Sequence, residues 1–277
     1  MSFFKDWNNH KSIALSMLAG TVILIIIITA NLTIDVKSIT MNLDIAGQGP
    51  SLAHPFGVDW IGRDMFLRTM KGLGGSLRVG LLAAILSIFI ALCLAVISAS
   101  LWSGFDHIIG IATDTCLGVP HIVIMVIISA ALGGGEVGVV TAVATTHWTS
   151  LTRILRAEIL QLREEHYIKQ SKNLGKSNFY IVRYHMLLHL LPQIIVRFIL
   201  LFPHVILHEA AITFLGFGLS PLHPAIGVIL SESIDYIATG MWWLVFFPGA
   251  ALLIMVMCFE SLGDGLNKIL SPETSRN

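Results

Sequence analysis

Long apolar runs alternate with shorter polar segments along most of this chain. Five runs lie at about 12–32, 76–101, 108–132, 192–215 and 241–259, and another follows the glycines at 133–135 and ends near 152. About 20 apolar residues in a helix span the roughly 30 Å of hydrocarbon in a bilayer. Prolines inside the runs are tolerated where neighbouring helices satisfy the freed carbonyls. The pattern therefore predicts an all-α, polytopic membrane protein with six transmembrane helices.

The longest polar interruption between these runs is residues 153–191. It contains seven Lys or Arg side chains and three Glu side chains, and such an excess of cations is typical of a cytoplasmic loop. Apolar residues recur at helical spacing before and after Leu174-Gly175, where a helix can turn. We therefore expect a helix, a glycine corner and a second helix in this loop.

The distribution of charge favours an orientation with both termini in the cytoplasm. In that orientation eleven Lys and Arg side chains lie inside and five outside, with Arg197 within a span. The chain then divides into three segments. Residues 1–75 form a cytoplasmic tail, the first transmembrane helix and an external segment; residues 76–262 form a five-helix core with the loop 153–191; and residues 263–277 form a cytoplasmic tail.

Composition agrees with a membrane protein and excludes several other classes. With 55% hydrophobic and 12% charged residues, the 277-residue chain has too little polar surface for a soluble globule. Its net charge of +0 provides no basic field for nucleic acid. The three cysteines, Cys93, Cys116 and Cys258, lie in apolar runs without CxxC spacing, so neither a disulfide framework nor a zinc site is indicated.

No catalytic motif is present in the sequence. Nothing matches the GxxxxGK[ST] pattern that cradles nucleotide phosphates, and GxSxG is also absent. We therefore expect a chain with no catalytic residues and no bound cofactor of its own.

Several polar side chains lie inside the predicted spans, where a buried charge is costly unless it has a partner or water. His204, His208 and Glu209 share one helical neighbourhood, and they either line a pathway or gate or form hydrogen bonds between helices. A bound metal is the weaker alternative, because HEAAI is not HExxH and no third ligand is evident. Asp114 in the third span either pairs with Arg197 or a backbone group, or lines the pathway.

The loop sequence REEHYIKQSKNLGKSNFYIVRYH resembles the cytoplasmic coupling loop of ATP-binding-cassette (ABC) importer permeases of the dipeptide/oligopeptide/nickel branch. The family's alanine pair is Gln170-Ser171 here, and its proline near the end of the loop is Leu188. The matching positions are Glu165, Tyr167, Ile168, Leu174, Gly175, Ser177, Ile181 and His185.

Other stretches resemble the same family. They are HPFGVDWIGRDMFLR before the second span, the Asp114-x5-Pro120 spacing, EAAITFLGFG at the end of the fifth span, and FPGAALL and SLGDGL in the last. The resemblance covers most of the chain beyond His54, and it implies a structural role for Glu209 near an outer gate.

The resemblance implies the fold of a type I ABC importer permease in a bacterial cell membrane. Such a chain pairs with a second homologous permease, two ABC ATPase subunits that bind ATP and Mg, and an extracellular or periplasmic solute-binding protein. Gly175 then permits a tight or left-handed backbone, while Tyr167, Ile168 and Leu174 fill a groove on the ATPase. The alternative for the loop is an amphipathic helix that lies on lipid head groups, favoured by its lysines.

The branch transports di- and oligopeptides, nickel, and metal chelates of opine-like compounds. Eleven histidines and a compact outer segment favour nickel or a metal chelate, with peptides as the alternative. Two other functional classes are alternatives to an importer subunit. An intramembrane metallohydrolase would bind zinc through His204, His208 and Glu209, and a gradient-driven secondary transporter would show inverted repeats, of which the sequence gives no sign.

Overall fold

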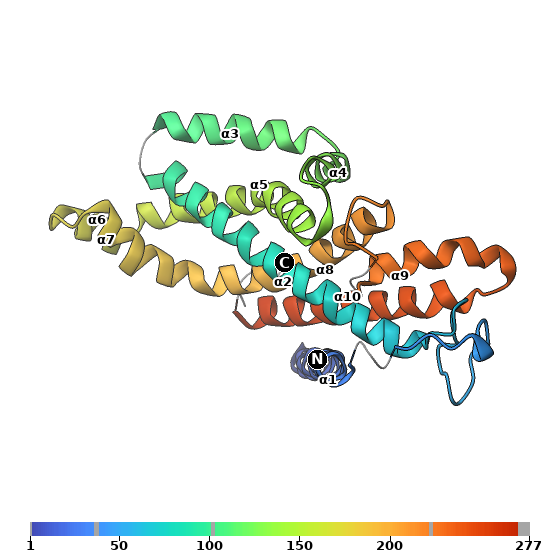
Figure 1. Ribbon diagram of the computed structural model, residues 1–277. Helices are drawn as coiled ribbons and strands as arrows, with labels where there is room; N and C mark the ends of the chain where they lie inside the picture. The colour runs from blue at the N-terminus through green and yellow to red at the C-terminus, as the bar shows by residue number, and fades with distance from the viewer. Residues whose placement is uncertain (1, 36–38, 101–102, 222–223, 271–277) are drawn as a thin grey trace.

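The computed structural model describes residues 2–35, 39–100, 103–221 and 224–270 of the 277-residue chain. Within these ranges the regular structure is helical, apart from one antiparallel bridge between Val58 and Asp64, so the all-α prediction is confirmed. Figure 1 shows long helices in the body of the molecule and shorter ones at its ends. The elements are α1 (Ser2–Thr33), η2 (Leu43–Ile45), α2 (Met65–Ser100), α3 (Ser103–Leu117), α4 (His121–Ala131), α5 (Gly135–Glu164), α6 (His166–Asn173), α7 (Asn178–Ile181), η3 (Val182–Met186), α8 (Leu187–Phe214), α9 (Ile226–Ser233), η4 (Ile234–Thr239) and α10 (Trp243–Leu270).

By length and composition, four helices in the described ranges could cross a membrane. They are Ala14–Thr33, Met65–Ser98, Asn178–Phe214 and Trp243–Leu270, and a bent pair formed by α3 and α4 brings the number to five. These segments coincide with five of the six predicted runs. The sixth, within α5, lies in a helix that is less apolar than the others. Six membrane crossings and the placement of both termini in the cytoplasm therefore stay predictions.

The predicted third span, 108–132, is two helices rather than one. α3 ends at Leu117, α4 begins at His121, and the two axes are bent by 96°. Pro120 stands directly before α4, where its ring disfavours a helical backbone at Val119 and its missing N–H removes a helical hydrogen bond. The predicted third span is thus bent at Pro120, and its crossing of the membrane as one broken span stays a prediction.

α5 packs along α2 through small and hydroxyl-bearing side chains. Ala91 and Ala95 of α2 are fully buried, and small side chains let two helix backbones approach closely. On α5, the Thr146 hydroxyl donates to the carbonyl of Ala142 at 2.9 Å, and the Thr152 hydroxyl donates across to the carbonyl of Ala91 at 3.4 Å. Burial of these satisfied hydroxyls explains how α5 lies inside the bundle without a continuous apolar sequence.

Glycines near the start of α2 let two other segments approach it. A Cβ added to Gly75 would lie 2.0 Å from the carbonyl oxygen of Pro224, in the turn before α9. A Cβ added to Gly74 would lie 1.8 Å from Nδ2 of Asn31, near the end of α1. The start of α2 therefore packs closely against both the end of α1 and the turn that leads into α9.

A network of charged side chains, Asp59, Arg63, Arg68 and Glu232, ties the segment before α2 to α9. Oδ2 of Asp59 accepts from Nε of Arg63 at 2.6 Å and from Nη1 of Arg68 at 3.4 Å. Both arginines also pair with Glu232 of α9, Arg63 at 3.1 Å. We call these four residues the outer network, and three of its members, Asp59, Arg63 and Arg68, belong to the HPFGVDWIGRDMFLR stretch.

The first helix packs against the last. A Cβ added to Gly20 of α1 would lie 3.2 Å from the carbonyl oxygen of Cys258, and a Cβ added to Gly265 of α10 would lie 2.2 Å from Sδ of Met17. The absence of side chains at these two glycines thus allows α1 and α10 to pack closely.

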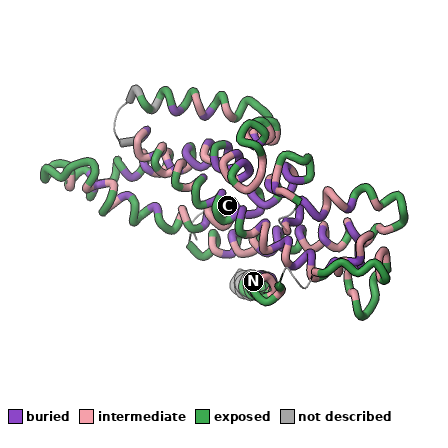
Figure 2. The backbone as a smooth tube through the Cα atoms, viewed as in Figure 1, coloured by how far each residue is buried: buried purple, intermediate pink, exposed green. Residues whose placement is uncertain are grey.

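The tip formed by α6 and α7 and the segment 39–64 with α9 lie at opposite ends of the molecule (Figure 1). Buried residues concentrate where the central helices meet, whereas α3 and the α6–α7 tip are largely exposed (Figure 2). α2 continues without a break across the predicted boundary at 75–76, and α10 does so at 262–263. The division into three segments stays a prediction, and residues 271–277 of the predicted tail lie outside the described residues.

Candidate functional site

The loop 153–191 contains two short helices, α6 and α7, between the end of α5 and the start of α8. α5 ends at Glu164, and Glu165 takes an extended backbone with φ −64° and ψ 139° before α6 begins. The chain then turns at Gly175, whose φ is +78°, and α7 starts after Ser177, whose hydroxyl accepts from the amide of Tyr180 at 3.3 Å. A positive φ is unfavourable with a Cβ, so the predicted glycine corner is confirmed. The first helix expected in the loop is the end of α5, and α6 is an additional helix.

A single π-helical turn, η3, joins α7 to α8. In this turn Nε2 of His185 lies 3.2 Å from the hydroxyl of Ser171 on α6. The His185 ring also contacts Tyr167 and Tyr180, with ring centroids 6.0 and 5.8 Å apart. Single π-helical turns are frequent at functional sites, and this one places His185 as a direct link between α6 and the start of α8.

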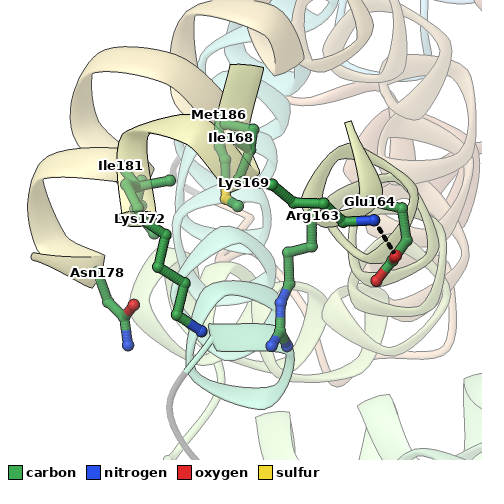
Figure 3. A pocket seen from close by; sticks show the side chains of 9 residues that line it. Arg163, Glu164, Ile168, Lys169, Lys172, Asn178, Ile181 and Met186 are labelled. Atoms are coloured by element: carbon green, nitrogen blue, oxygen red, sulfur yellow. Dashed lines mark ion pairs between the residues drawn. The ribbon is translucent and has the colours of Figure 1, made fainter. Parts of the chain in front are cut away.

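A cavity of about 210 Å³ opens between the end of α5, α6 and the α7–η3 segment (Figure 3). Its apolar part contains Ile168 and Ile181, which are buried, while the Lys169 ammonium pairs with Glu164 at 2.8 Å. Figure 3 shows the Arg163 and Lys172 side chains extending to one side of it. The cavity is lined by Arg163, Glu164, Ile168, Lys169, Lys172, Asn178, Ile181, Val182 and Met186.

The apolar side chains of the loop divide into a buried and an exposed set. Ile168 is only 4% exposed and belongs to the core of its own chain, so the structure contradicts the expectation that it fills a groove on another protein. Tyr167 is 40% exposed, Leu174 80% and Phe179 74%. Phe179 was not among the predicted residues. Tyr167, Leu174 and Phe179 are therefore exposed apolar side chains on the α6–α7 part of the loop.

The pKa values of two carboxyl groups in the loop are shifted in opposite directions. Lys169 donates a hydrogen bond to Glu164 and lowers the pKa of that carboxyl. Burial raises the pKa of Glu158, and the charges of Arg197 and His189 act in the opposite direction. Glu164 is thus held as a carboxylate, while Glu158 takes up a proton more readily than an exposed glutamate does.

Glu209 of α8 is fully buried and is linked by hydrogen bonds through Thr213 to the turn that follows the helix. Its Oε1 accepts from the Thr213 hydroxyl at 3.0 Å, and the oxygen of that hydroxyl accepts from the amide of Leu219 at 3.1 Å. Its Oε2 has no hydrogen-bond partner at ordinary distance among the described residues, although the Ser76 hydroxyl of α2 lies near the carboxyl. This environment favours the structural interpretation of Glu209.

His204 and His208 do not form one site with Glu209. Nδ1 of His208 donates to the carbonyl of His204 at 2.7 Å, and the His208 ring lies 5.1 Å from that of His147 on α5. The Glu209 carboxyl instead bonds to Thr213. Among the described residues, no group of three or more His, Cys, Asp or Glu side chains is placed to hold a metal ion.

Asp114 of α3 pairs with Arg153 of α5, with 2.6 Å between Oδ1 and Nη2. Both side chains are largely exposed, at 74% and 58%. The expected pairing with Arg197 or a backbone group is therefore wrong, and the pair lies at the edge of the loop 153–191.

A family model of binding-protein-dependent transport system inner membrane components matches residues 91–276. The matched part is more than half of the chain and includes the loop and its glycine corner. The chain belongs to this family. It is thus a multi-pass inner-membrane permease subunit of the ABC type and not itself an enzyme.

The permease is similar along most of its length to several curated proteins. It is 31% identical to a putative peptide transport system permease protein of Brucella abortus, over 95% of this chain and 88% of that protein. It is 33% identical to a dipeptide transport system permease protein of Alkalihalophilus pseudofirmus, over 98% and 88%. It is 31% identical to the corresponding protein of Bacillus subtilis, over 82% and 71%.

The permease also shares its fold with a solved structure. The crystal structure of an amino acid ABC transporter with histidines superposes with a TM-score of 0.54 and 17% sequence identity, over 71% of this chain and 91% of that one. This likeness supports the permease fold and carries no information on the substrate.

Two histidines that sequence reasoning missed lie beside His208. His121 begins α4, and His147 sits in the middle of α5, only 6% exposed. Their rings lie 5.4 Å from each other and 6.4 and 5.1 Å from the ring of His208. The spacing of His204 and His208 on one helix was the only sign of this cluster in the sequence. His121 and His147 lie more than 50 residues away along the chain, so no local pattern connects them with His208.

Proposed function

We propose that this permease and a second homologous permease form the translocation pathway of an ATP-driven importer of di- or oligopeptides. Two ABC ATPase subunits, which bind ATP and Mg, dock on the loop 153–191, and an extracellular or periplasmic solute-binding protein delivers the cargo. The relatives in Brucella, Bacillus and Alkalihalophilus carry names that refer to peptides and dipeptides. These names favour peptides over the nickel or metal chelate expected from the sequence.

The geometry of the loop is the observation that carries the coupling part of this proposal. α6 follows α5 after the single residue Glu165, and α7 continues through η3 into α8. Ile168 and Ile181 anchor the two short helices to the core, while Leu174 and Phe179 are exposed at the tip. A partner that displaces this tip therefore moves α5 and α8 together, which is the kind of rigid-body shift that alternating access requires.

Substitution of Gly175 tests the coupling role. No atom lies within 4 Å of a Cβ built on Gly175, so any effect comes from its positive φ rather than from a clash. Left-handed backbone costs an L-residue about 1–2 kcal/mol, whereas Asn tolerates it. In the complete complex in proteoliposomes, we expect Gly175→Leu to lose the stimulation of ATP hydrolysis by loaded binding protein, and Gly175→Asn, of similar size, to retain it.

Two results would contradict the proposal. Full stimulation in the Gly175→Leu complex would remove the loop from the coupling path, and uptake of cargo without ATPase subunits would indicate a gradient-driven transporter. Mass spectrometry and metal analysis of the ligand that copurifies with the binding protein separate a peptide from nickel or a metal chelate.

A further inference from the structure

An ion pair between α2 and the start of α5 lies open at the surface of the chain. Nη2 of Arg78 donates to Oε2 of Glu136 at 2.5 Å, and the two side chains are 61% and 32% exposed. Arg78 belongs to α2, and Glu136 lies in the first turn of α5. Charges exposed to acyl chains are costly, so charged side chains of membrane helices face protein or water or reach the head groups. The depth of this pair in the bilayer therefore decides what covers it.

The length of α2 places Arg78 at the outer boundary of the hydrocarbon. α2 has 36 residues and begins beside the segment 39–64 at one end of the molecule (Figure 1). At 1.5 Å per residue it is roughly 54 Å long, whereas the hydrocarbon is about 30 Å thick. In the predicted orientation its last 20 or so residues cross the bilayer, and its first turns project outward. Arg78 then lies at the level of the lipid head groups.

A cavity of about 300 Å³ lies beside this pair and is lined by Lys71, Arg78 and Glu136 among others. Lys71 precedes Arg78 by two helical turns, and its Nζ donates to the carbonyls of Asn31 and Ile34 at 2.7 and 2.9 Å. An ammonium has three N–H donors and a guanidinium five, so both cations can donate to a further oxygen. The cavity thus combines two cations that can hold a phosphate with one carboxylate that can accept from an ammonium group.

An exposed apolar stripe continues from Arg78 along α2 toward the cytoplasmic side. Leu82, Ile85 and Phe89 are 45%, 52% and 63% exposed, and we call them the α2 stripe. They follow Arg78 by four, seven and eleven residues, which places them on one face of the helix. A charged cavity at head-group level is therefore followed by an apolar track at the level of the acyl chains.

We propose that the cavity and the α2 stripe bind a phospholipid whose head group carries a primary ammonium, as phosphoethanolamine does. The phosphate lies against Lys71 and Arg78, the ammonium lies against Glu136, and one acyl chain follows the α2 stripe. A choline head group has no N–H to donate to Glu136, and a glycerol head group has no cation. Glu136 therefore selects between phospholipids that share the same phosphate, and this selection does not depend on the importer's cargo.

Thermal unfolding of the delipidated, full-length chain in dodecylmaltoside tests this site. The chain is mixed with dioleoylphosphatidylethanolamine, with dioleoylphosphatidylcholine, or with glycerophosphoethanolamine, which has the head group without acyl chains. A ligand that binds only the folded state raises the melting temperature. We expect the ethanolamine lipid to raise it by several degrees more than the choline lipid, and the chain-free head group to leave it unchanged. Glu136→Gln should abolish the difference between the two lipids, and Arg78→Gln should reduce the shift with both.

Asp114→Asn is the matched control. It breaks another exposed ion pair between two helices, Asp114 with Arg153, whose side chains are 74% and 58% exposed. This variant should keep the full difference between the two lipids. Equal shifts with both lipids in the wild-type chain, or an unchanged difference in Glu136→Gln, overturn the site. A shift with the chain-free head group as large as that with the lipid also overturns it, because the α2 stripe would then take no part.

The second permease is the competing occupant of this face, and photo-crosslinking in the complete complex decides between the two. A benzophenone maleimide is attached to Leu82→Cys in a chain whose three native cysteines are replaced by alanine. We expect adducts with phospholipid, which mass spectrometry identifies. Adducts with the second permease and none with lipid would show that the α2 stripe is a subunit interface, and they would overturn the proposal.

Discussion

At the scale of single residues, Asp59 organises the segment in front of α2. Its carboxylate accepts from the amides of Ile61 and Arg63 at 3.0 and 2.8 Å, and it also pairs with the side chains of Arg63 and Arg68. The Asp59 side chain is fully buried. A buried carboxylate is stable only when its lone pairs are satisfied in this way, so the outer network depends on this one charge.

Replacement of Asp59 by Asn should destabilise the permease strongly. Loss of one partner from a buried ion pair costs about 3–5 kcal/mol, because the remaining charges stay buried. We expect a clear fall in the melting temperature of the purified chain in detergent. Glu136→Gln is the control, since it breaks a 2.5 Å pair with Arg78 that is partly exposed and should cost at most about 1 kcal/mol. Equal melting temperatures for the two variants would show that the outer network does not stabilise the fold.

Residue-scale features could be predicted from the sequence only where their cause is local. Gly175 was identified because a corner between two helical patterns requires a residue that tolerates positive φ. The partner of Asp114 was not, because Arg153 lies 39 residues further along the chain. His121 and His147 were missed for the same reason, since only the packing of α4, α5 and α8 brings them together.

At the scale of helices, the glycines near the start of α2 set how closely its neighbours can approach. Gly75 faces the carbonyl oxygen of Pro224, which is backbone and cannot rotate away, whereas Gly74 faces the side chain of Asn31. Gly110 of α3 has no atom within 4 Å of a Cβ position. All three glycines lie within helices, so replacement by Ala changes helix propensity equally at each. Differences in stability between the variants then report how closely neighbouring atoms approach the new methyl group.

A Gly→Ala series at these positions should rank by what the new methyl group meets. Ala is favoured over Gly in a helix by roughly 0.5–1 kcal/mol, whereas overpacking costs about 1–3 kcal/mol. We expect Gly75→Ala to lower the melting temperature most, Gly74→Ala less, and Gly110→Ala not at all. A melting temperature for Gly75→Ala at or above that of Gly110→Ala would mean that α2 and the turn before α9 are not in close contact.

The helices themselves could be predicted to different degrees. The apolar windows of α1, α2, α8 and α10 are continuous and therefore visible in the sequence. α5 owes its place in the bundle to threonines and to the alanines of α2, and hydropathy does not register such packing. Pro120 lies inside the predicted third span, and its effect on the preceding backbone accounts for the 96° bend between α3 and α4, which hydropathy does not reveal.

At the scale of the whole molecule, the loop tip and the segment 39–64 lie at opposite ends (Figure 1). If the bundle crosses the membrane with its termini inside, the tip faces the cytoplasm and the segment faces outward. Leu174 and Leu52 are 80% and 104% exposed at these two ends. They are therefore suitable positions for reporter cysteines.

Labelling with a membrane-impermeant maleimide tests this orientation. In a chain whose three native cysteines are replaced by alanine, we expect Leu52→Cys to react in spheroplasts or intact cells. Leu174→Cys should react only after the membrane is opened, because its side chain lies on the cytoplasmic side. Reaction of Leu174→Cys in sealed cells would contradict the orientation and the docking of ATPases on the loop.

The close packing of α1 against α10 has a consequence for biogenesis. Translation delivers α1 to the bilayer first, but the helix that fits around Gly20 is the last to emerge from the ribosome. Before α10 emerges, α1 can be held by its contacts with α2, where Nζ of Lys71 donates to the carbonyl of Asn31 at 2.7 Å. A message truncated before codon 243 would therefore leave α1 as a loosely tethered helix in lipid, open to membrane proteases.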